Sequence, residues 1–263
     1  MPPQGSDGGR TIKAVEHSLS ILDYLYSAGP STLSTIAKAI GLSPGSTHTH
    51  LSTLAAHGFI EQRAQQYALS RRLIGIGERT RNQQAVYQAA KNPLHTLADE
   101  TGEAAHLIQE YEGLILLLYE VYGAKAVGVE YHSHKRDQLI RHLHCTASGK
   151  ALLSKLPQER VEEILETSGL EKNTPNTITD PDELFEALER IEERGYAIAD
   201  EEQMLGMRAV GVPVMRVDAT VAAAISASGP PSRLKGDRLH EDLRDAVLQA
   251  AEKTEINLNA NSM

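Results

Sequence analysis

Two short helical patterns, joined by a glycine turn and followed at once by two short alternating runs, constrain the fold of this chain more than any other feature. Apolar residues recur at helical spacing through Ser34–Ile40, and Gly41 then fits the left-handed position of a tight turn. Ser43 is a good N-cap, and Pro44 is tolerated at the first helical position. The second helix is therefore expected to run from Pro44 to about Ala56.

The segments on either side of this pair complete a recognisable arrangement. An earlier apolar helical pattern extends over residues 15–26 and is stopped by Gly29-Pro30. After the pair, Phe59–Gln62 and Gln66–Leu69 alternate around Arg63-Ala64-Gln65, which predicts a hairpin. The sequence thus predicts a winged helix-turn-helix.

The helix from Pro44 to Ala56 has one face suited to nucleic acid. Thr47, His50, Leu51 and Leu54 follow the spacing i, i+3, i+4, i+7 and are expected to face the core. The opposite face carries short, uncharged, hydrogen-bonding side chains that suit base edges and phosphates in a major groove. The residues predicted to contact DNA on this helix are Ser43, whose first-turn amides suit a phosphate, and Pro44, Gly45, Ser46, His48, Thr49, Ser52 and Thr53.

The predicted wing supplies the charge that the helix lacks. Arg63, Gln65 and Gln66 are placed to reach an adjacent minor groove or the backbone, and Arg71 and Arg72 follow at its foot. Because the predicted recognition helix contains no Arg or Lys, an alternative stays open. In that alternative the chain is a ligand-sensing interaction module whose winged helix binds protein rather than DNA.

The charge is divided unevenly along the chain. The 263 residues carry a net charge of −9, which by itself argues against coating DNA by bulk electrostatics. Residues 1–82, however, hold eight Lys or Arg and five Asp or Glu, a net charge of +3, and the remaining 181 hold 18 and 30, a net charge of −12. This division indicates two domains with different partners.

Composition excludes several other classes. With 4% aromatic residues and no Trp, the chain does not suit a stacking platform for single-stranded nucleic acid. One cysteine, Cys145, rules out an intramolecular disulfide and a cysteine-based zinc finger. The sequence has no run of 18 apolar residues, so no membrane span is predicted. Met1–Gly9 has no apolar stretch typical of a signal peptide, and we therefore expect a cytoplasmic protein.

The organisation beyond the wing predicts a second domain. Residues 1–10 are expected to form a disordered arm, 11–72 the winged helix, 73–91 a linker helix that ends before Pro93, and 92–263 an α+β domain with a mostly antiparallel sheet. The predicted strands are 104–111, 114–122, 126–131, 195–200, 209–217 and 220–228, and the predicted helices are 93–100, 148–155, 158–167, 181–194 and 237–254.

Within the second domain, Thr146-Ala147-Ser148-Gly149 leads into a helix. The free amides at such a start form a cradle for a carboxylate or phosphate. The spacing is not that of a P-loop, so nucleotide hydrolysis is not indicated.

A group of histidines surrounds Cys145. His132, His134, His142 and His144 have i, i+2 spacings that suit a transition metal, although solvent-facing or internally bonded histidines explain the same pattern. Neighbours on a strand point to opposite faces, so Cys145 and His144 do not establish a nucleophile and base. We therefore predict no cofactor, no metal and no catalytic residue, and hence no enzyme.

Over about Thr11 to Ile256 the sequence resembles the isocitrate-lyase-regulator (IclR) family of transcriptional regulators. The matching stretches in the first domain are LSTIAKAIGL (33–42), HGFIE (57–61) and YALSRRL (67–73). Those in the second are LHCTASGKALL (143–153), RGYAIADEE (194–202) and ISASGP (225–230). The order and spacing of these pieces together are specific.

This resemblance implies a regulator that binds operator DNA, with a C-terminal domain that has a curved sheet and binds a small, anionic effector. It also implies a homodimer formed through the N-terminal domains, or a homotetramer. The family binds effector carboxylates on the backbone matching Ala147 and Ser148, with hydroxyls matching Ser226 and Ser228, although strand alternation onto a polar face also explains these serines. Asp200 matches one of an acidic pair whose other position here is Ala199, and Ala209 stands where many members have Cys.

The recognition helix departs from the family pattern. Thr49 stands where a basic residue is usual and Thr47 where a β-branched apolar residue is usual. We therefore expect an unusual operator and a larger contribution from the wing and the arm.

Overall fold

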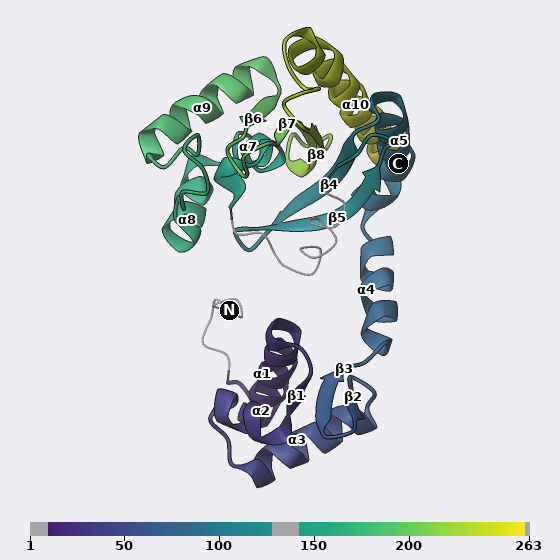
Figure 1. The fold of residues 1–263 in the computed structure, drawn as a ribbon, viewed down its shortest axis with the longest axis vertical. Coiled ribbons are helices and arrows are strands. Elements are labelled where there is room, and N and C mark those ends of the chain that lie inside the picture. Colours follow the sequence, from purple (N-terminus) through teal and green to yellow (C-terminus); the bar gives the residue numbers. More distant parts are fainter. Residues whose placement is uncertain (1–9, 128–141, 261–263) are drawn as a thin grey trace. The chain divides into compact units, whose positions relative to one another are not determined.

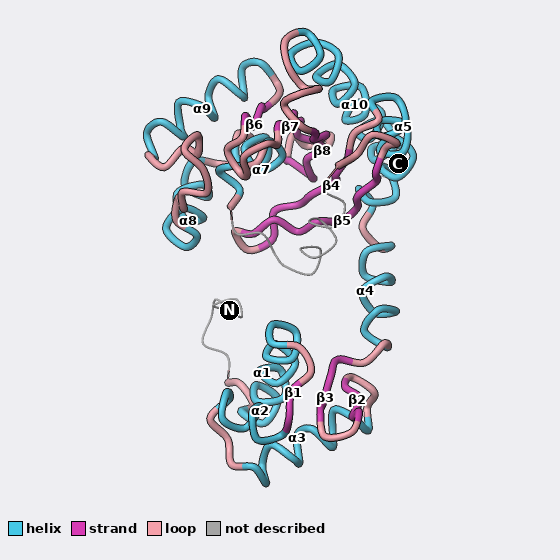
Figure 2. Tube along the Cα trace, in the orientation of Figure 1, coloured by secondary structure: helices cyan, strands magenta, loops and turns pink. Residues whose placement is uncertain are grey.

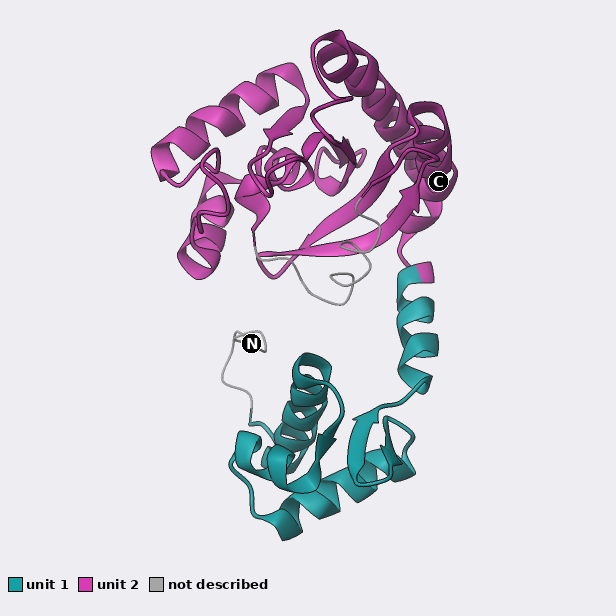
Figure 3. Ribbon diagram, viewed as in Figure 1, with its two compact units in different colours: residues 1–81 teal, residues 82–263 magenta. Residues whose placement is uncertain are grey.

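The structure, a computed structural model, describes residues 10–127 and 142–260. Two compact units divide the chain, Met1–Arg81 and Asn82–Met263 (Figure 3). The division falls within residues 73–91, the segment predicted as the connector. Each unit has its own hydrophobic core and is described by itself.

The first unit is built from three packed helices and a small sheet (Figure 1). Helices α1 (Lys13–Ala28), α2 (Leu33–Ile40) and α3 (Pro44–Ala56) enclose a core with the antiparallel hairpin of β2 (Ile60–Arg63) and β3 (Gln66–Leu69). The buried residues of this core are Ile21, Leu25, Ile36, Leu51, Leu54, Ile60 and Tyr67. The winged helix-turn-helix predicted from the sequence is confirmed.

The sheet of the first unit contains one strand that the sequence did not predict. β1 (Ser31–Thr32) pairs with β3, so the strand order is β1-β3-β2. Two residues are too few to alternate visibly, and Thr32 also serves as the N-cap of α2, where its hydroxyl accepts a hydrogen bond from the amide of Thr35.

The predicted connector ends in a different place from the one expected. α4 (Arg72–Asn82) stops before Gln84, and α5 (Ala85–Thr101) then continues through Pro93 without a break. The prediction of a helix end before Pro93 was therefore wrong. A proline inside a helix leaves the carbonyl four residues earlier without its usual donor. Here that carbonyl, Ala89 O, accepts a hydrogen bond from Asn257 Nδ2 at 3.1 Å, which compensates for the missing amide.

The second unit contains a five-stranded antiparallel sheet with the order β5-β4-β8-β7-β6, as Figure 2 shows in magenta. Its strands are β4 (Ala104–Tyr111), β5 (Leu114–Tyr122), β6 (Ala197–Asp200), β7 (Arg208–Met215) and β8 (Val221–Gly229). The α+β class and the antiparallel sheet agree with the prediction. The predicted strand 126–131 is not confirmed at Ala126 and Val127, which are not in a strand, and its other residues lie outside the described part of the chain.

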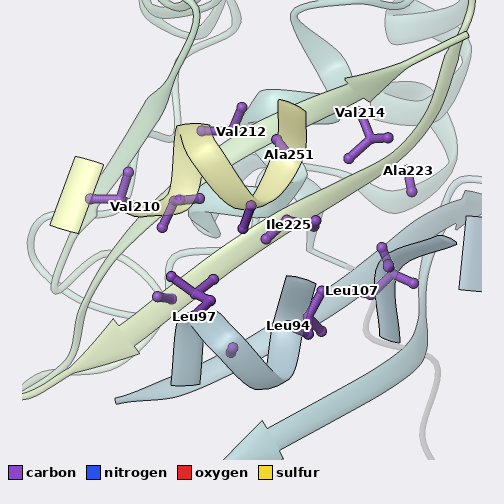
Figure 4. Close-up of a cluster of buried hydrophobic side chains, with 14 of the residues drawn as sticks. Leu94, Leu97, Leu107, Val210, Val212, Val214, Ala223, Ile225 and Ala251 are labelled. Atoms are coloured by element: carbon purple, nitrogen blue, oxygen red, sulfur yellow. The ribbon is translucent and has the colours of Figure 1, made fainter. Parts of the chain in front are cut away.

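Helices cover both faces of this sheet. α5 and α10 (Arg244–Ala260), the latter preceded by one π-helical segment (Arg238–Leu243), bury the face that carries Leu107, Val212 and Ile225 (Figure 4). The other face carries Ile108 and Ala224. It is covered by α7 (Ala147–Leu153), which follows a short 3-10 helix η1 (Leu143–Cys145), and by α8 (Gln158–Ser168) and α9 (Pro181–Arg194).

Candidate functional site

The recognition helix α3 presents an uncharged polar surface. Its start is capped as predicted, since Ser43 Oγ accepts the amide of Ser46 at 3.2 Å and Pro44 occupies the first turn. Thr47, Leu51 and Leu54 are buried, and His50 is half-buried with its Nδ1 2.9 Å from Ser18 Oγ. The predicted contact residues of this helix are all exposed, namely Ser43, Pro44, Gly45, Ser46, His48, Thr49, Ser52 and Thr53.

The wing residues are exposed too, but the arginines differ in their surroundings. Arg63 forms an ion pair with Glu61 at 2.5 Å, Gln65 lies in the turn between the two strands, and Gln66 is the first residue of β3. Arg71 is exposed. Arg72 donates to the carbonyl of His57 and stacks over the Phe59 ring, 5.1 Å from its centroid, so it also supports the fold of the first unit.

A cavity of about 90 Å³ lies in the second unit between the sheet and α7. This volume is well below the roughly 300–1,000 Å³ of pockets that hold drug-sized molecules, so the cavity suits a small ligand. Five of the seven predicted effector residues line it: Ala147, Ser148, Ala209, Ser226 and Ser228. The other lining residues were not predicted: His106, Ile108, Ile115, Leu117, Thr146, Ala199, Gln203 and Met207.

Three serine hydroxyls give the cavity its polar character. The side chains of Ser148, Ser226 and Ser228 are more than nine-tenths buried. Within residues 10–127 and 142–260 no hydrogen bond is found for any of the three hydroxyls, and because all three residues line the cavity, the hydroxyls are open to a ligand there. The amides of Ala147 and Ser148 open α7 and have no carbonyl of their own helix to bond.

The two remaining predicted effector residues do not line the cavity. In β6 successive side chains alternate, so Ala199 faces the cavity while Asp200 is exposed and pairs with Arg208 Nε at 2.5 Å. Gly149 is packed so closely that no side chain would fit at this position. A Cβ at this position would lie 2.2 Å from the carbonyl oxygen of Leu143.

Gly211, which the sequence did not single out, allows α7 to approach the sheet. A Cβ at this residue of β7 would lie 2.4 Å from the carbonyl carbon of Ala147. Gly211 is also the cross-strand neighbour of Ser226. The small residue therefore permits the start of α7 to lie directly on the strand that neighbours the serines.

One edge of the cavity contains an imidazole backed by a carboxylate. His106 on β4 is the neighbour of Ser226 on one side and of Glu120 on the other. Its Nε2 lies 3.1 Å from Glu120 Oε1, and the Glu120 side chain is only 2% exposed. A β-bulge between Leu107 and Ile108 shifts the register of β5, so that sequence alternation alone does not place Glu120 on this face.

A buried ion pair lies beside the cavity and was not predicted either. Lys150 Nζ is 2.6 and 2.7 Å from the two carboxylate oxygens of Glu202. Burial raises the pKa of Glu202, and the ammonium of Lys150 opposes that rise. The one feature of the sequence that could have indicated this ion pair is the single Lys among the small and apolar residues of α7.

The histidine and cysteine cluster is placed only in part. His142 and His144 have ring centroids 5.7 Å apart, and His144 Nε2 lies 3.1 Å from the carbonyl of Glu171. His132 and His134 lie outside the described residues. Among the residues that are described, no group of three or more His, Cys, Asp or Glu is arranged to hold a metal ion.

Cys145 is a buried thiol rather than a nucleophile in a cleft. Burial raises its pKa to about 11, while a hydrogen bond from Asn173 Nδ2 at 3.1 Å opposes the rise. Burial also lowers the pKa of His144. A thiol with this pKa is almost entirely protonated at neutral pH.

In the described ranges 10–127 and 142–260, no helix is both long and apolar enough to span a bilayer.

Two protein-family models match the sequence. The IclR helix-turn-helix domain matches residues 14–64, and the bacterial transcriptional regulator IclR C-terminal domain matches residues 79–256. The chain is similar to the probable HTH-type transcriptional regulator ArcR of Halobacterium salinarum, with 32% identity over 98% of this chain and 99% of the relative.

Solved structures have the same fold. The IclR of Thermotoga maritima matches with a TM-score of 0.72 and 26% identity, over 94% of this chain and 99% of the other. An IclR homolog of Microbacterium hydrocarbonoxydans, solved in complex with 4-hydroxybenzoate, matches with a TM-score of 0.77 and 22% identity, over 94% and 99%. These matches extend over both compact units.

Proposed function

The chain belongs to the IclR family of transcriptional regulators, which have a helix-turn-helix DNA-binding domain and a C-terminal effector-binding domain, and from this premise we propose which of its residues carry each activity. We assign DNA binding to residues 11–72, the connection to 73–91 and effector binding to 92–263. We also place the protein in the cytoplasm, where DNA and metabolites are both accessible.

In this proposal α3 enters the major groove of a double-stranded operator. Its exposed hydroxyls contact base edges and phosphates, and Arg63, Gln65, Gln66 and Arg71 of the wing contact the backbone or the adjacent minor groove. Arg72 contributes less to DNA, because its guanidinium already bonds the carbonyl of His57. The uncharged α3 supports an interface in which the wing supplies most of the phosphate contacts.

We propose that the operator is bound by a homodimer formed through α1. Exposed apolar side chains on and just before this helix recur at the spacing of an apolar stripe, and they are between 51% and 67% exposed: Ile12, Val15, Leu19 and Tyr26. A second copy of the same stripe is a self-complementary partner, as two-fold symmetry requires. Such a dimer calls for an operator with two-fold symmetry.

We propose that the cavity of the second unit binds a small carboxylic acid. The observation that carries this assignment is the set of three serine hydroxyls that line the cavity without a hydrogen bond to another described residue, next to the open amides of Ala147 and Ser148. A carboxylate is an acceptor with about four lone-pair sites, which donors of these two kinds can fill. Leu117, Ile115 and Met207 line the remainder of the cavity and suit a short apolar portion.

Regulation then follows from linkage. An acid that binds one arrangement of the dimer more tightly than another shifts the population towards that arrangement. The acid then changes the affinity for the operator by the same factor by which the operator changes the affinity for the acid. The direction of that change decides whether the acid releases the protein from the operator or strengthens its binding.

A mobility-shift assay with the DNA upstream of the chain's own gene tests this function. We expect a specific shift that weakens steeply as salt rises and that changes when small carboxylic acids are added. A chain that gives no salt-sensitive specific shift, with or without acids, contradicts the proposal and favours a winged helix that binds protein.

A further inference from the structure

Two separate segments of the second unit form facing parts of the cavity wall. One is α7, which contributes Ala147 and Ser148. The other is the loop after β6, residues 201–207, which contributes Gln203 and Met207. The effector site is complete only when both segments are in place.

The ion pair between Lys150 and Glu202 joins these two segments. Lys150 lies one helical turn after Ala147 on α7, and Glu202 precedes Gln203 directly. The two residues are 4% and 7% exposed, and both carboxylate oxygens lie within 2.7 Å of the ammonium. Neither side chain lines the cavity.

Hydrogen bonds to the backbone of the loop also hold it in place. Thr177 Oγ1 donates to the carbonyl of Glu202 at 2.6 Å, and Thr174 Oγ1 donates to the carbonyl of Glu201 at 2.7 Å. Within the loop, the amide of Glu201 donates to the carbonyl of Met207 at 3.0 Å. These bonds fix the ends of the loop, while the Glu202 carboxylate fixes its position relative to α7.

Stability alone does not account for a pair of this kind. Removing two charges from water costs several kcal/mol, and an apolar pair of similar volume is often as stable or more so. What the ion pair adds is a defined geometry, because Lys150 reaches both oxygens of one carboxylate.

We propose that Lys150 and Glu202 are positioning residues for effector binding, which hold Gln203 and Met207 against the ligand without touching it. This inference rests on the proposed effector site and adds a determinant of its affinity. Substituting either residue is expected to loosen the loop and to lower the affinity for the acid, while the affinity of the effector-free protein for DNA stays the same.

The test compares Lys150→Met and the double variant Lys150→Met/Glu202→Gln with a matched control. The control is Arg233→Met, which breaks another ion pair of the same unit, between the half-buried Arg233 and the buried Glu103: Arg233 contacts Glu103 at 2.6 and 2.8 Å, and neither residue lines the cavity. Hydrogen exchange is measured at the amides of Glu201 and Gly206, together with the thermal midpoint. Affinities are measured for four probes: acetate, pyruvate, lactate and 4-hydroxybenzoate.

We expect faster exchange of the loop amides and about tenfold weaker binding in the Lys150 variants, a loss that corresponds to roughly 1.4 kcal/mol. The Arg233 variant is expected to lower the thermal midpoint but to leave loop exchange and probe affinity unchanged.

Unchanged exchange in the Lys150 variants overturns the inference, as does an affinity loss equal to that of the Arg233 variant at equal loss of stability. If no probe binds the wild-type chain, the proposed small-carboxylate site fails, and loop exchange alone decides the positioning role. The two failures are therefore distinguishable.

Discussion

The two units of this chain present their polar side chains in opposite ways. In the first, short polar side chains of α3 are exposed on a helix without charged residues, while Thr47, Leu51 and Leu54 of the same helix are buried. In the second, Ser148, Ser226 and Ser228 are buried, and charged groups such as Lys150 are buried with them. An exposed surface suits a large partner that brings its own charge, whereas a buried polar cavity suits a small one that must lose its water.

This difference also decides what the sequence predicts. On α3, helical spacing alone separates Thr47 and Leu51 from the exposed face, because the spacing of residues within one helix decides which face each residue lies on. In the second unit, Ser226 and Ser228 were predicted through a family resemblance, and the residues that neighbour them in the sheet depend on strand register. His106 and Glu120 become neighbours only through β4–β5 pairing with its bulge.

The differences between the predictions and the structure have the same origin. Pro93 was expected to end a helix, and only a residue 164 positions later, Asn257, supplies the donor that allows the helix to continue. Asp200, which the resemblance assigns to the effector site, does not line the cavity, because strand alternation directs Ala199 towards it instead. Local signals thus predicted elements and caps, while long-range contacts determined which side chains meet in the cavity.

The largest expected effect comes from charging the recognition surface. Thr49→Glu/Ser52→Glu places two carboxylates opposite DNA phosphates, and like charges in an interface cost several kcal/mol. We expect at least about a 100-fold loss of operator affinity, measured by mobility shift, with unchanged affinity for acids.

The control for this variant is Gln158→Glu/Gln249→Glu, which makes the same change in net charge on exposed helical positions of the second unit. A loss of DNA binding as large as that of the α3 variant would show that net charge, rather than α3, determines affinity.

A smaller effect is expected from the cavity. Ser226→Ala/Ser228→Ala removes two donors to a carboxylate, and hydrogen bonds to charged groups contribute about 1.5–3 kcal/mol each. We expect a 10- to 100-fold weaker affinity for the acid by calorimetry, since the two losses are not fully additive, and no change in DNA binding without acid.

Thr254→Val is the matched control, because Thr254 is a buried hydroxyl on α10 that bonds the carbonyl of Ala250 and does not line the cavity. Equal loss of acid binding in both variants would indicate general destabilisation of the second unit.

The two arginines at the foot of the wing allow a finer test. Arg71→Gln removes an exposed charge, so we expect the slope of log affinity against log salt to become smaller by about one, with unchanged stability. Arg72→Gln removes the bond to His57 and the contact with Phe59, so it is expected to lower the free energy of unfolding of the first unit by about 1–2 kcal/mol. The opposite pattern for the two variants would contradict the assignment of Arg71 to DNA.

The last effect, which is confined to alkaline pH, concerns the pH dependence of the buried thiol. The pKa of Cys145 is raised to about 11 from an ordinary value of 9.0, so the unfolded chain releases this proton first as pH rises. The free energy of unfolding should therefore fall between pH 9 and 11, by at most about 1.4 kcal/mol per pH unit. The free energy of unfolding is measured by urea at several pH values for the wild type and for Cys145→Ala. If it falls equally steeply with pH in the two proteins, the pKa of Cys145 is not raised by folding.

The connection between the two units is the central claim, and reciprocal linkage tests it most directly. Operator affinity is titrated against the best-binding carboxylic acid, and the affinity for that acid is measured with and without operator, in the wild type and in Ser226→Ala/Ser228→Ala. We predict that the acid changes operator affinity by the same factor by which the operator changes acid affinity, and that the double variant needs proportionately more acid for the same change. An operator affinity that does not change when the cavity is saturated with acid contradicts the account.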